Sequence, residues 1–351
     1  MNTLHRFYFE DSSRMSALDA ESVDLVVTSP PYPMIAMWDD LFCAQSASVG
    51  RALREENGPA AFECMHTVLD AVWREVLRVT KPGGIVCINV GDATRTVAGN
   101  FALYTNHSRI LGYLLSLGFS ALPTVLWRKQ TNAPNKFMGS GVWPPGAYVT
   151  LEHEYVLILR KGALRRFSSS TEKANRRQSA LFWEERNVWF SDLWDLRGVR
   201  QAFDTNATRT RSAAFPFELA YRLVCMYSIY GDTVLDPFAG TGTTLVAALT
   251  AGRSSVGVEI DAGLAPIITE SLRDAMPVAW ARQRKRIDDH LAFVAEHESA
   301  KGRTLSHVNT VHGFPVMTRQ ETDLRVVDVV AVSAETSGLV IAEHEPLAPA
   351  E

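Results

Sequence analysis

The sequence lacks several features that mark other classes of protein. It has only four cysteines in 351 residues, and no two of them form a CxxC pair, so neither a zinc site nor a disulfide framework is indicated. No apolar run approaches the roughly 18 residues of a membrane span, and the first residues do not combine a charged segment with an apolar core. We therefore expect a cytoplasmic protein with no metal and no membrane partner.

Positive charge is also scarce, except in one segment. The formal net charge is −4, which on average disfavours a nucleic-acid partner. Residues 160–211, however, hold twelve lysines and arginines against six acidic residues, a segment charge of +6. Aromatic residues are interleaved with them, namely Phe167, Phe182, Trp183, Trp189, Phe190 and Trp194. The mixture is typical of a polyanion-binding surface with stacking side chains, and a solvated charged face is the alternative.

Short β-rich runs alternate with helical patterns along most of the chain. Strands are expected at residues 5–10, 23–28, 84–90, 121–127, 154–161, 233–238 and 254–260. Strands separated by helices predict a mostly parallel sheet covered on both faces. Residues 34–61 fit a long loop or short helices, and the chain beyond about residue 300 offers two short strands without an evident role.

The first motif is TSPPY, residues 28–32, which follows the apolar run Val23–Val27. Two successive prolines end the strand and hold the next turn rigid. A rigid turn that carries a hydroxyl and an aromatic ring, at the carboxyl end of a buried strand, suits binding of a planar polar group. An ordinary strand exit is the alternative interpretation of these five residues alone.

The second motif is VLDPFAGTGTT, residues 234–244, a strand that enters a glycine-rich turn and then a helix. Gly240 and Gly242 allow a tight turn close to a ligand, and the helix amino terminus offers N–H groups. Neither the GxGxxG spacing nor the GK[ST] ending of a P-loop is present. The next strand ends in Glu259, where doubly wound folds bind ribose hydroxyls. The motif therefore indicates a nucleotide-type cofactor loop.

Together the two motifs resemble those of the S-adenosylmethionine-dependent DNA amino-methyltransferases, [DNS]PP[YFW] and FxGxG. The catalytic motif comes first, which resembles the beta class, in which the methyltransferase fold is circularly permuted. The similarity covers about residues 4–275 and includes RVTKPGG, HEYVLILRKG and AAFPFELAYRLV. It implies an α/β fold with a doubly wound, mostly parallel, seven-stranded sheet of the Rossmann-like methyltransferase type.

The resemblance also divides the chain into parts. Residues 1–161 match the catalytic half of the methyltransferase domain and residues 211–300 its cofactor-binding half. Between them, residues 162–210 fit an inserted target-recognition region. Residues 301–351 are left as a carboxyl-terminal extension of unknown role.

The resemblance implies S-adenosyl-L-methionine as the cofactor and assigns residues to it. The catalytic residues are Ser29, Pro30, Pro31 and Tyr32. The cofactor-binding residues are Asp11, Phe215, Pro216, Asp236, Phe238, Gly240, Gly242, Thr243, Thr244 and Glu259. Among these, Asp236 matches the acid at the methionine end, Glu259 the acid on the ribose, and Asp11 the acid near the adenine amino group.

Double-stranded DNA is the implied partner, held by Arg165, Arg166, Arg176 and Arg177. A cognate restriction endonuclease and a homodimer are further partners that the resemblance allows. Methylation of an exocyclic amine needs acceptors that orient the lone pair of the amine toward the methyl group, for which Ser29 and the Pro30 carbonyl are placed. Tyr32 would stack on the base after the base has left the duplex.

Several target groups stay open at this point. Carbon-5 methylation of cytosine needs a cysteine that follows a proline in that family, and none of the four cysteines does. Serine as the first letter of the motif resembles cytosine-N4 enzymes, whereas aspartate resembles most adenine-N6 enzymes. Cytosine N4 is therefore preferred, with adenine N6 as the alternative. An RNA or protein-glutamine methyltransferase and a non-catalytic nucleic-acid reader are the remaining alternatives.

Overall fold

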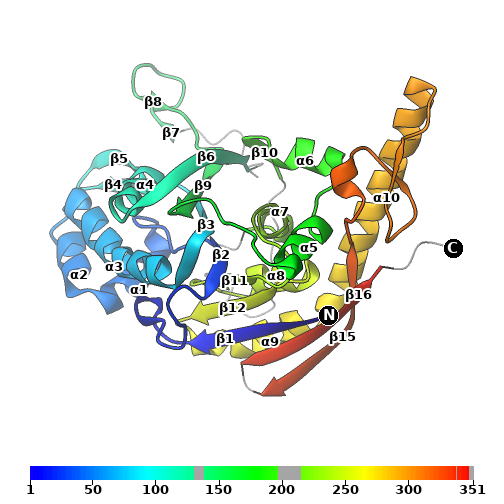
Figure 1. The fold of residues 1–351 in the computed structure, drawn as a ribbon. Helices are drawn as coiled ribbons and strands as arrows, with labels where there is room; N and C mark the ends of the chain where they lie inside the picture. Colours follow the sequence, from blue (N-terminus) through cyan, green and yellow to red (C-terminus); the bar gives the residue numbers. More distant parts are fainter. Residues whose placement is uncertain (130–137, 197–214, 337, 348–351) are drawn as a thin grey trace.

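The structure is a computed structural model that describes residues 1–129, 138–196, 215–336 and 338–347. Its centre is a large sheet with helices packed on both faces (Figure 1). In spatial order, the strands of this sheet in the described residues are β10 (Leu193–Asp195), β6 (Phe119–Arg128), β9 (His153–Lys161), β3 (Thr80–Val90), β2 (Val23–Thr28), β11 (Thr233–Asp236), β12 (Ser254–Glu259), β1 (Asn2–Phe9), β16 (Leu339–Pro346) and β15 (Val327–Thr336).

Three two-stranded sheets accompany the large one in the described part of the chain. They are β4 (Ala93–Val97) with β5 (Asn100–Tyr104), β7 (Met138–Gly139) with β8 (Ala147–Tyr148), and β13 (His307–Val308) with β14 (Pro315–Val316). Single 3₁₀ turns occur at η1 (Ser12–Arg14), η2 (Ala36–Trp38), η3 (Ala262–Leu264) and η4 (Arg319–Glu321).

The direction of the strands places the two motifs side by side. β3, β2, β11, β12 and β1 are parallel to one another, so their carboxyl ends meet at one edge of the sheet, the carboxyl edge. β9 runs antiparallel to β3 and β6, so its first residues lie at this same edge. The opposite side, where the parallel strands begin, is the amino edge.

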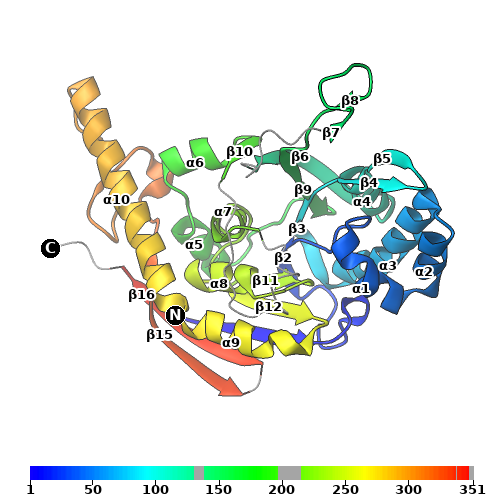
Figure 2. The same cartoon turned by 180° about the vertical axis from the view of Figure 1, so that it is seen from behind.

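Helices cover both faces because the central strands are apolar on both. Val26 of β2 joins the core on one face, and Leu25 and Val27 join the core on the other. The first face is covered by α1 (Asp39–Gln45), α2 (Ala47–Arg54), α3 (Gly58–Val79) and α4 (Asn106–Ser116). The second is covered by α7 (Phe217–Tyr227), α8 (Thr243–Thr250), α9 (Ala265–Arg273) and α10 (Ala275–Lys301), and Figure 2 brings α9 and α10 forward.

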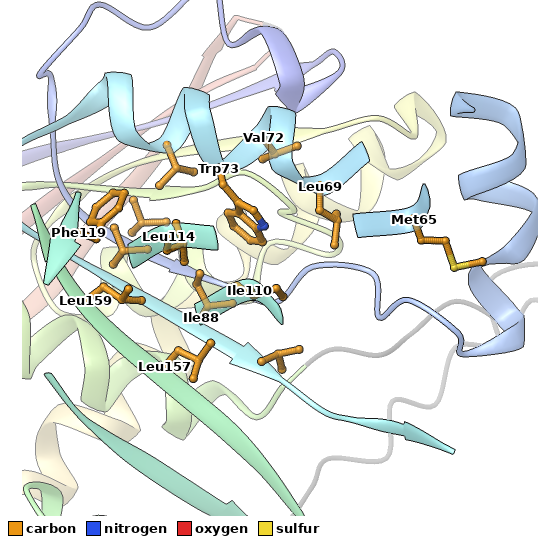
Figure 3. Close-up of a cluster of buried hydrophobic side chains, with 14 of the residues drawn as sticks. Met65, Leu69, Val72, Trp73, Ile88, Ile110, Leu114, Phe119, Leu157 and Leu159 are labelled. Atoms are coloured by element: carbon orange, nitrogen blue, oxygen red, sulfur yellow. The ribbon is translucent and has the colours of Figure 1, made fainter. Parts of the chain in front are cut away.

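The core on the first face forms around Trp73, whose side chain is fully buried. Figure 3 shows Leu69, Val72 and Trp73 of α3 facing Ile88 of β3, with side chains of α4 and β9 beside them. The apolar positions of α3 recur at helical spacing, which is why this helix lies flat on the sheet.

The predicted α/β class is confirmed, with one correction to the number of strands. The seven expected strands form the middle of the sheet, and β10 extends one side of it while β16 and β15 extend the other. β16 pairs antiparallel with β1, so the unpaired backbone groups of β1 gain partners. The extension beyond residue 300 therefore completes the sheet. That the fold is circularly permuted stays a prediction.

Residues 34–61 form short helices, as one of the two expectations had it. The target-recognition region contains α5 (Ser170–Gln178), α6 (Trp183–Trp189) and β10, and residues 197–210 of it lie outside the described residues. In the part of the chain that the structure describes, no helix is long and apolar enough to cross a bilayer.

Candidate functional site

The catalytic turn follows β2 directly at the carboxyl edge. Pro30 and Pro31 are buried, whereas Ser29 and Tyr32 are half-buried. The Ser29 Oγ lies 3.1 Å from the Tyr32 hydroxyl oxygen. The structure thus brings the four predicted catalytic residues together, with the hydroxyl and the phenol in hydrogen-bond contact.

The Tyr32 hydroxyl belongs to a network that reaches two neighbouring strands. It donates to Glu154 Oε2 at 2.9 Å and accepts from Asn89 Nδ2 at 2.9 Å. Asn89 Nδ2 also donates to Glu154 Oε2 at 2.6 Å, and Lys129 Nζ forms an ion pair with Glu154 Oε1. Asn89 and Glu154 are buried, which strengthens these contacts because little water competes for them.

This network fixes the direction of the Ser29 hydroxyl. Burial and the Glu154 carboxylate hold the pKa of Tyr32 well above its usual value, so the phenol keeps its single hydrogen. That hydrogen goes to Glu154, whose other oxygen is paired with Lys129. Tyr32 therefore meets Ser29 as an acceptor. Ser29 donates its only hydrogen to the phenol, and its lone pairs can accept hydrogen bonds from a ligand.

Three members of this network, Asn89, Lys129 and Glu154, were not among the predicted site residues. Asn89 is a polar residue in the apolar strand segment GIVCINV, and Glu154 precedes the apolar run YVLIL. A polar side chain at either end of an apolar strand segment is a signal that could have identified both.

Asp236 joins the catalytic turn to the glycine loop. Its carboxylate accepts hydrogen bonds from Thr28 Oγ1 and Thr244 Oγ1, both at 2.6 Å, and from the Phe238 N–H at 3.0 Å. Thr28 ends β2, and Thr244 lies in the first turn of α8. Asp236 is only 2% exposed, so the structure places it as a buried clamp between the two motifs.

The glycine loop leads from Phe238 into α8. Gly240 and Gly242 have φ angles of +53° and +86°, a region that side chains disfavour. A Cβ on Gly240 would meet only the Phe238 carbonyl oxygen, at 3.9 Å, so the loop leaves open space there. Thr243 opens α8, whose amino terminus presents backbone N–H groups to an anionic or polar ligand.

Two carboxylates flank the loop at adjacent strand ends. Glu259, at the end of β12, accepts a hydrogen bond from the Gly240 N–H at 2.8 Å. Phe9 of β1 is in register with Glu259, so Asp11, two residues further, lies at the neighbouring strand end. Asp11 is exposed and accepts a hydrogen bond from the Ser13 N–H at 2.8 Å.

Phe215 and Pro216 directly precede α7. Because α7 leads into the start of β11 at the amino edge, its own first residues lie toward the carboxyl edge. Phe238, from the glycine loop, meets Trp73 edge to face with ring centroids 6.0 Å apart. The ten predicted cofactor residues thus lie at the strand ends, turns and helix starts of this edge, and five of them are buried, namely Phe215, Pro216, Asp236, Gly242 and Thr244.

These groups fit a cofactor with ribose hydroxyls and an adenine ring. Open space beside Gly240, the amino terminus of α8 and the exposed Asp11 surround one region next to the catalytic turn. In the described ranges, no group of three or more His, Cys, Asp and Glu residues is placed to hold a metal ion.

The predicted DNA-binding arginines lie at the amino edge of the sheet. Arg165 forms ion pairs with Asp232 at 2.7 Å and with Asp24 at 3.4 Å. Asp232 directly precedes β11, and Asp24 is the second residue of β2. Ser29 follows the other end of β2, so Arg165 and Ser29 are separated by the length of the strand, about 20 Å.

Helix α5 holds Arg176 and Arg177 at the same edge, and Arg166 directly follows Arg165. Asn175 Nδ2 in α5 donates to the Tyr230 carbonyl oxygen at 2.9 Å, shortly before β11. Arg177 pairs with Asp323 at 2.8 Å. A shallow cavity of about 510 Å³ at this edge is lined by Arg165, Arg166, Phe167, Lys173, Arg176 and Arg177. The structure therefore does not bring these arginines together with the catalytic turn.

The aromatic residues of the basic segment are only partly on the surface. Phe182, Trp189 and Trp194 are between 0% and 4% exposed, so the expectation that the segment presents them for stacking is wrong. Trp189 and Trp194 pack in the core of the second face because large aromatic side chains contribute most when buried.

A doubly wound sheet that places a glycine loop, flanking carboxylates and a rigid acceptor turn at its carboxyl edge defines a group transferase with a nucleotide-type cofactor. The chain belongs to the N6/N4 DNA methylase family, whose model matches residues 23–270.

Close relatives support this membership. The Type II methyltransferase M.MthZI of Methanothermobacter thermautotrophicus is 48% identical over 328 residues, 93% of this chain and 91% of that protein. M.MjaI of Methanocaldococcus jannaschii is 47% identical over 283 residues, 78% of this chain and 92% of that protein. A candidate DNA modification methylase of Thermus thermophilus, solved with S-adenosyl-L-methionine, has a TM-score of 0.61 and 33% identity, covering 78% of this chain and 95% of that one.

The Asp236 clamp predicts a pH-dependent stability. Burial raises the pKa of Asp236 from its ordinary 3.8 to about 6, although hydrogen bonds from Thr244 and Thr28 lower it. The folded state therefore favours the protonated carboxyl, and this contribution to stability is lost as pH rises through that window. Between pH 4 and 6, the free energy of unfolding of the wild type, measured with urea, should fall by up to about 3 kcal/mol relative to that of Asp236→Asn. A constant difference would contradict the raised pKa.

Arg165 is expected to act as a structural residue. Arg165→Ala leaves the buried Asp232 and Asp24 with fewer positive partners, so the free energy of unfolding should fall by about 2 kcal/mol. The neighbouring and exposed Arg166 is the matched control, and Arg166→Ala should change the free energy of unfolding by less than about 0.5 kcal/mol. Equal losses in urea unfolding for the two variants would refute the difference in role.

Proposed function

We propose that this protein is a site-specific DNA methyltransferase that transfers a methyl group from S-adenosyl-L-methionine to the N4 amine of a cytosine flipped out of the duplex. The observation that carries the proposal is the polarised chain of contacts from Lys129 through Glu154 and Tyr32 to Ser29. It turns the Ser29 oxygen into an acceptor at the end of β2.

An exocyclic amine is a poor nucleophile because its lone pair is delocalised into the ring. Acceptance of one N–H hydrogen by Ser29 Oγ and of the other by the Pro30 carbonyl favours a more tetrahedral nitrogen, whose lone pair then points away from both acceptors. S-adenosyl-L-methionine, when bound at the glycine loop, supplies the methyl group on a sulfonium. In a direct transfer the carbon–nitrogen bond forms as the sulfur–methyl bond breaks, the thioether S-adenosylhomocysteine leaves, and the nitrogen releases one of its hydrogens as a proton to water, so no covalent enzyme intermediate is needed.

Besides accepting the Ser29 hydrogen, Tyr32 offers its ring to the base in this proposal. Its hydroxyl is held by Asn89 and Glu154, so its ring has a fixed position beside Ser29. Gly91 contributes to this fit, because a Cβ there would lie 3.1 Å from the Tyr32 ring and 3.2 Å from Glu154 Cγ. A fixed aromatic face is a suitable platform for a flipped base.

Cytosine is preferred over adenine because serine occupies the first position of the catalytic motif, as in the cytosine-N4 enzymes that the sequence resembles. The Type II names of the two archaeal relatives support a place in restriction–modification, with a cognate endonuclease as partner. A homodimer is a further proposal that the relatives leave open. A cytoplasmic location is also a proposal, supported by four cysteines that are all free, as a reducing compartment keeps them.

DNA contact by Arg165, Arg166, Arg176 and Arg177 also stays a proposal. Arg166 and Arg176 are the exposed cations suited to phosphate contact, since Arg165 and Arg177 are already ion-paired. Phosphates bound there would lie about one strand length, roughly 20 Å, from the reacting base.

Replacement of Ser29 tests the mechanism. Ser29→Ala removes the acceptor and should slow single-turnover methylation by about 10²- to 10³-fold, the usual effect of one lost catalytic hydrogen bond. Affinity for cofactor and DNA should change little, because Ser29 is not part of the clamp between the motifs. The measurement uses labelled cofactor and duplex DNA whose target site has first been mapped by methylation-sensitive sequencing of plasmid DNA from a methylase-free bacterial host.

The exposed Ser120 at the amino-edge end of β6 is the matched control, and Ser120→Ala should keep the wild-type rate. An unchanged rate in Ser29→Ala would refute the acceptor role. Nucleoside analysis of the product identifies the base: N4-methylcytosine supports the proposal, and N6-methyladenine would replace the base while keeping the reaction class.

Glu154 is expected to act as a positioning residue. In Glu154→Gln the side-chain amide can donate to Tyr32, which reverses the direction of the chain and turns a hydrogen of Tyr32 toward Ser29. We expect the methylation rate to fall by roughly 10-fold or more. Glu152→Gln, two residues away and paired with Arg128 at 3.6 Å, should leave the rate unchanged. Similar rates for both variants would rule out a positioning role.

A further inference from the structure

The chain between β6 and β9 leaves the sheet at its carboxyl edge, where the catalytic turn lies. Arg128, the last residue of β6, is paired with His153, the first residue of β9, at the carboxyl edge. The Lys129 N–H donates to the Glu152 carbonyl oxygen at 2.8 Å, one residue further out. Lys129 itself contacts Glu154 in the network that holds Tyr32. The two ends of this connection are therefore fixed next to the network that holds Tyr32.

The connection carries a projecting hairpin formed by β7 and β8. Figures 1 and 2 both show it standing clear of the body of the protein. Its tip is ordered by backbone hydrogen bonds from Ser140 N–H to the Gly146 carbonyl at 2.9 Å and from Trp143 N–H to the Ser140 carbonyl at 3.4 Å. Yet Trp143 is 75% exposed, and Val142 and Val149 are 75% and 84% exposed.

A second hairpin lies beside the first. β4 begins at Ala93, three residues after β3 ends at the carboxyl edge, and pairs with β5. Phe101 of β5 stacks on Tyr148 of β8, with ring centroids 4.5 Å apart and planes 9° apart. Leu103 of β5 is 48% exposed. The two hairpins therefore form one apolar rim at the edge where the catalytic turn ends.

Apolar side chains gathered at this edge indicate an interaction surface, since large apolar groups are normally buried. The described hairpin residues 138–149 carry no acidic or basic side chain, so they offer no charged group to phosphates. They suit the stacked faces of bases. When a base leaves the duplex it leaves a gap in the stack, which an apolar wedge can fill.

We propose that the β7–β8 hairpin contacts the duplex beside the extruded base and that Trp143 at its tip fills the gap in the base stack. The proposal rests on the proposed DNA-methyltransferase function and extends it to the step before methyl transfer. The indole replaces the stacking that the extruded base gives up, so Trp143 stabilises the open duplex while Tyr32 holds the base.

The test compares Trp143→Ala with wild type in single-turnover methylation of two duplexes. One carries the target base in its normal pair, and the other carries it opposite a mismatched base. If Trp143 stabilises the extruded state, the variant should lose about 10- to 100-fold in rate on the paired duplex and regain most of that on the mismatched one, where opening costs less. Trp280→Ala, in which the replaced indole is 51% exposed on α10, should behave as wild type on both.

A paired-duplex rate equal to wild type would overturn the proposal, and so would an equal loss on both duplexes, which would indicate general DNA affinity. A second measurement places pyrrolocytosine, a fluorescent cytosine analogue that pairs with guanine, at the target position, because its fluorescence rises on unstacking. Trp143→Ala should reduce that rise, and an unchanged rise would also overturn the proposal. Failure of the proposed function is separate, since the wild type itself would then methylate neither duplex.

Discussion

The arrangement of the site depends on one buried carboxylate. Asp236 accepts hydrogen bonds from Thr28 at the end of the catalytic strand and from Thr244 at the start of α8. A shift of either motif along its strand would leave a buried carboxylate with an unfilled acceptor, which is costly. The distance between the turn proposed to hold the base and the loop proposed to hold the cofactor is therefore set by strand register, and the proposed in-line transfer requires such a fixed distance.

The acceptor character of Ser29 arises from outside the catalytic motif. The proline-rich turn fixes the position of the serine, but the direction of its hydrogen follows from Glu154 on β9 and from Lys129, which directly follows β6. The ion pair of Lys129 with Glu154 thus affects the catalytic turn through two intervening side chains, Glu154 and Tyr32. The motif contributes Ser29 and Tyr32, and Glu154 on the antiparallel strand β9 sets the direction of their hydrogen bonds.

Much of this structure could be predicted from the sequence, because strand alternation and the two motifs are local signals. The central strands and both turns lie where the pattern placed them. The predictions that failed concerned where side chains lie once the chain has folded. A count of charges does not tell which edge of a sheet carries Arg165, and an aromatic such as Trp194 looks the same in a core as on a binding surface. The contact between Asn89 and Glu154 needs the register of strands far apart in the chain.

The position of β1 between two other strands has a consequence for biosynthesis. β1 pairs with β12 on one side and with β16 on the other, and the first residue donates to the His344 carbonyl at 2.6 Å. β1 must therefore wait for β12 and β16, which are translated long after it. Until then its apolar face and open backbone groups are exposed, which makes the growing chain a substrate for chaperones and leaves sheet closure as a late, cooperative event.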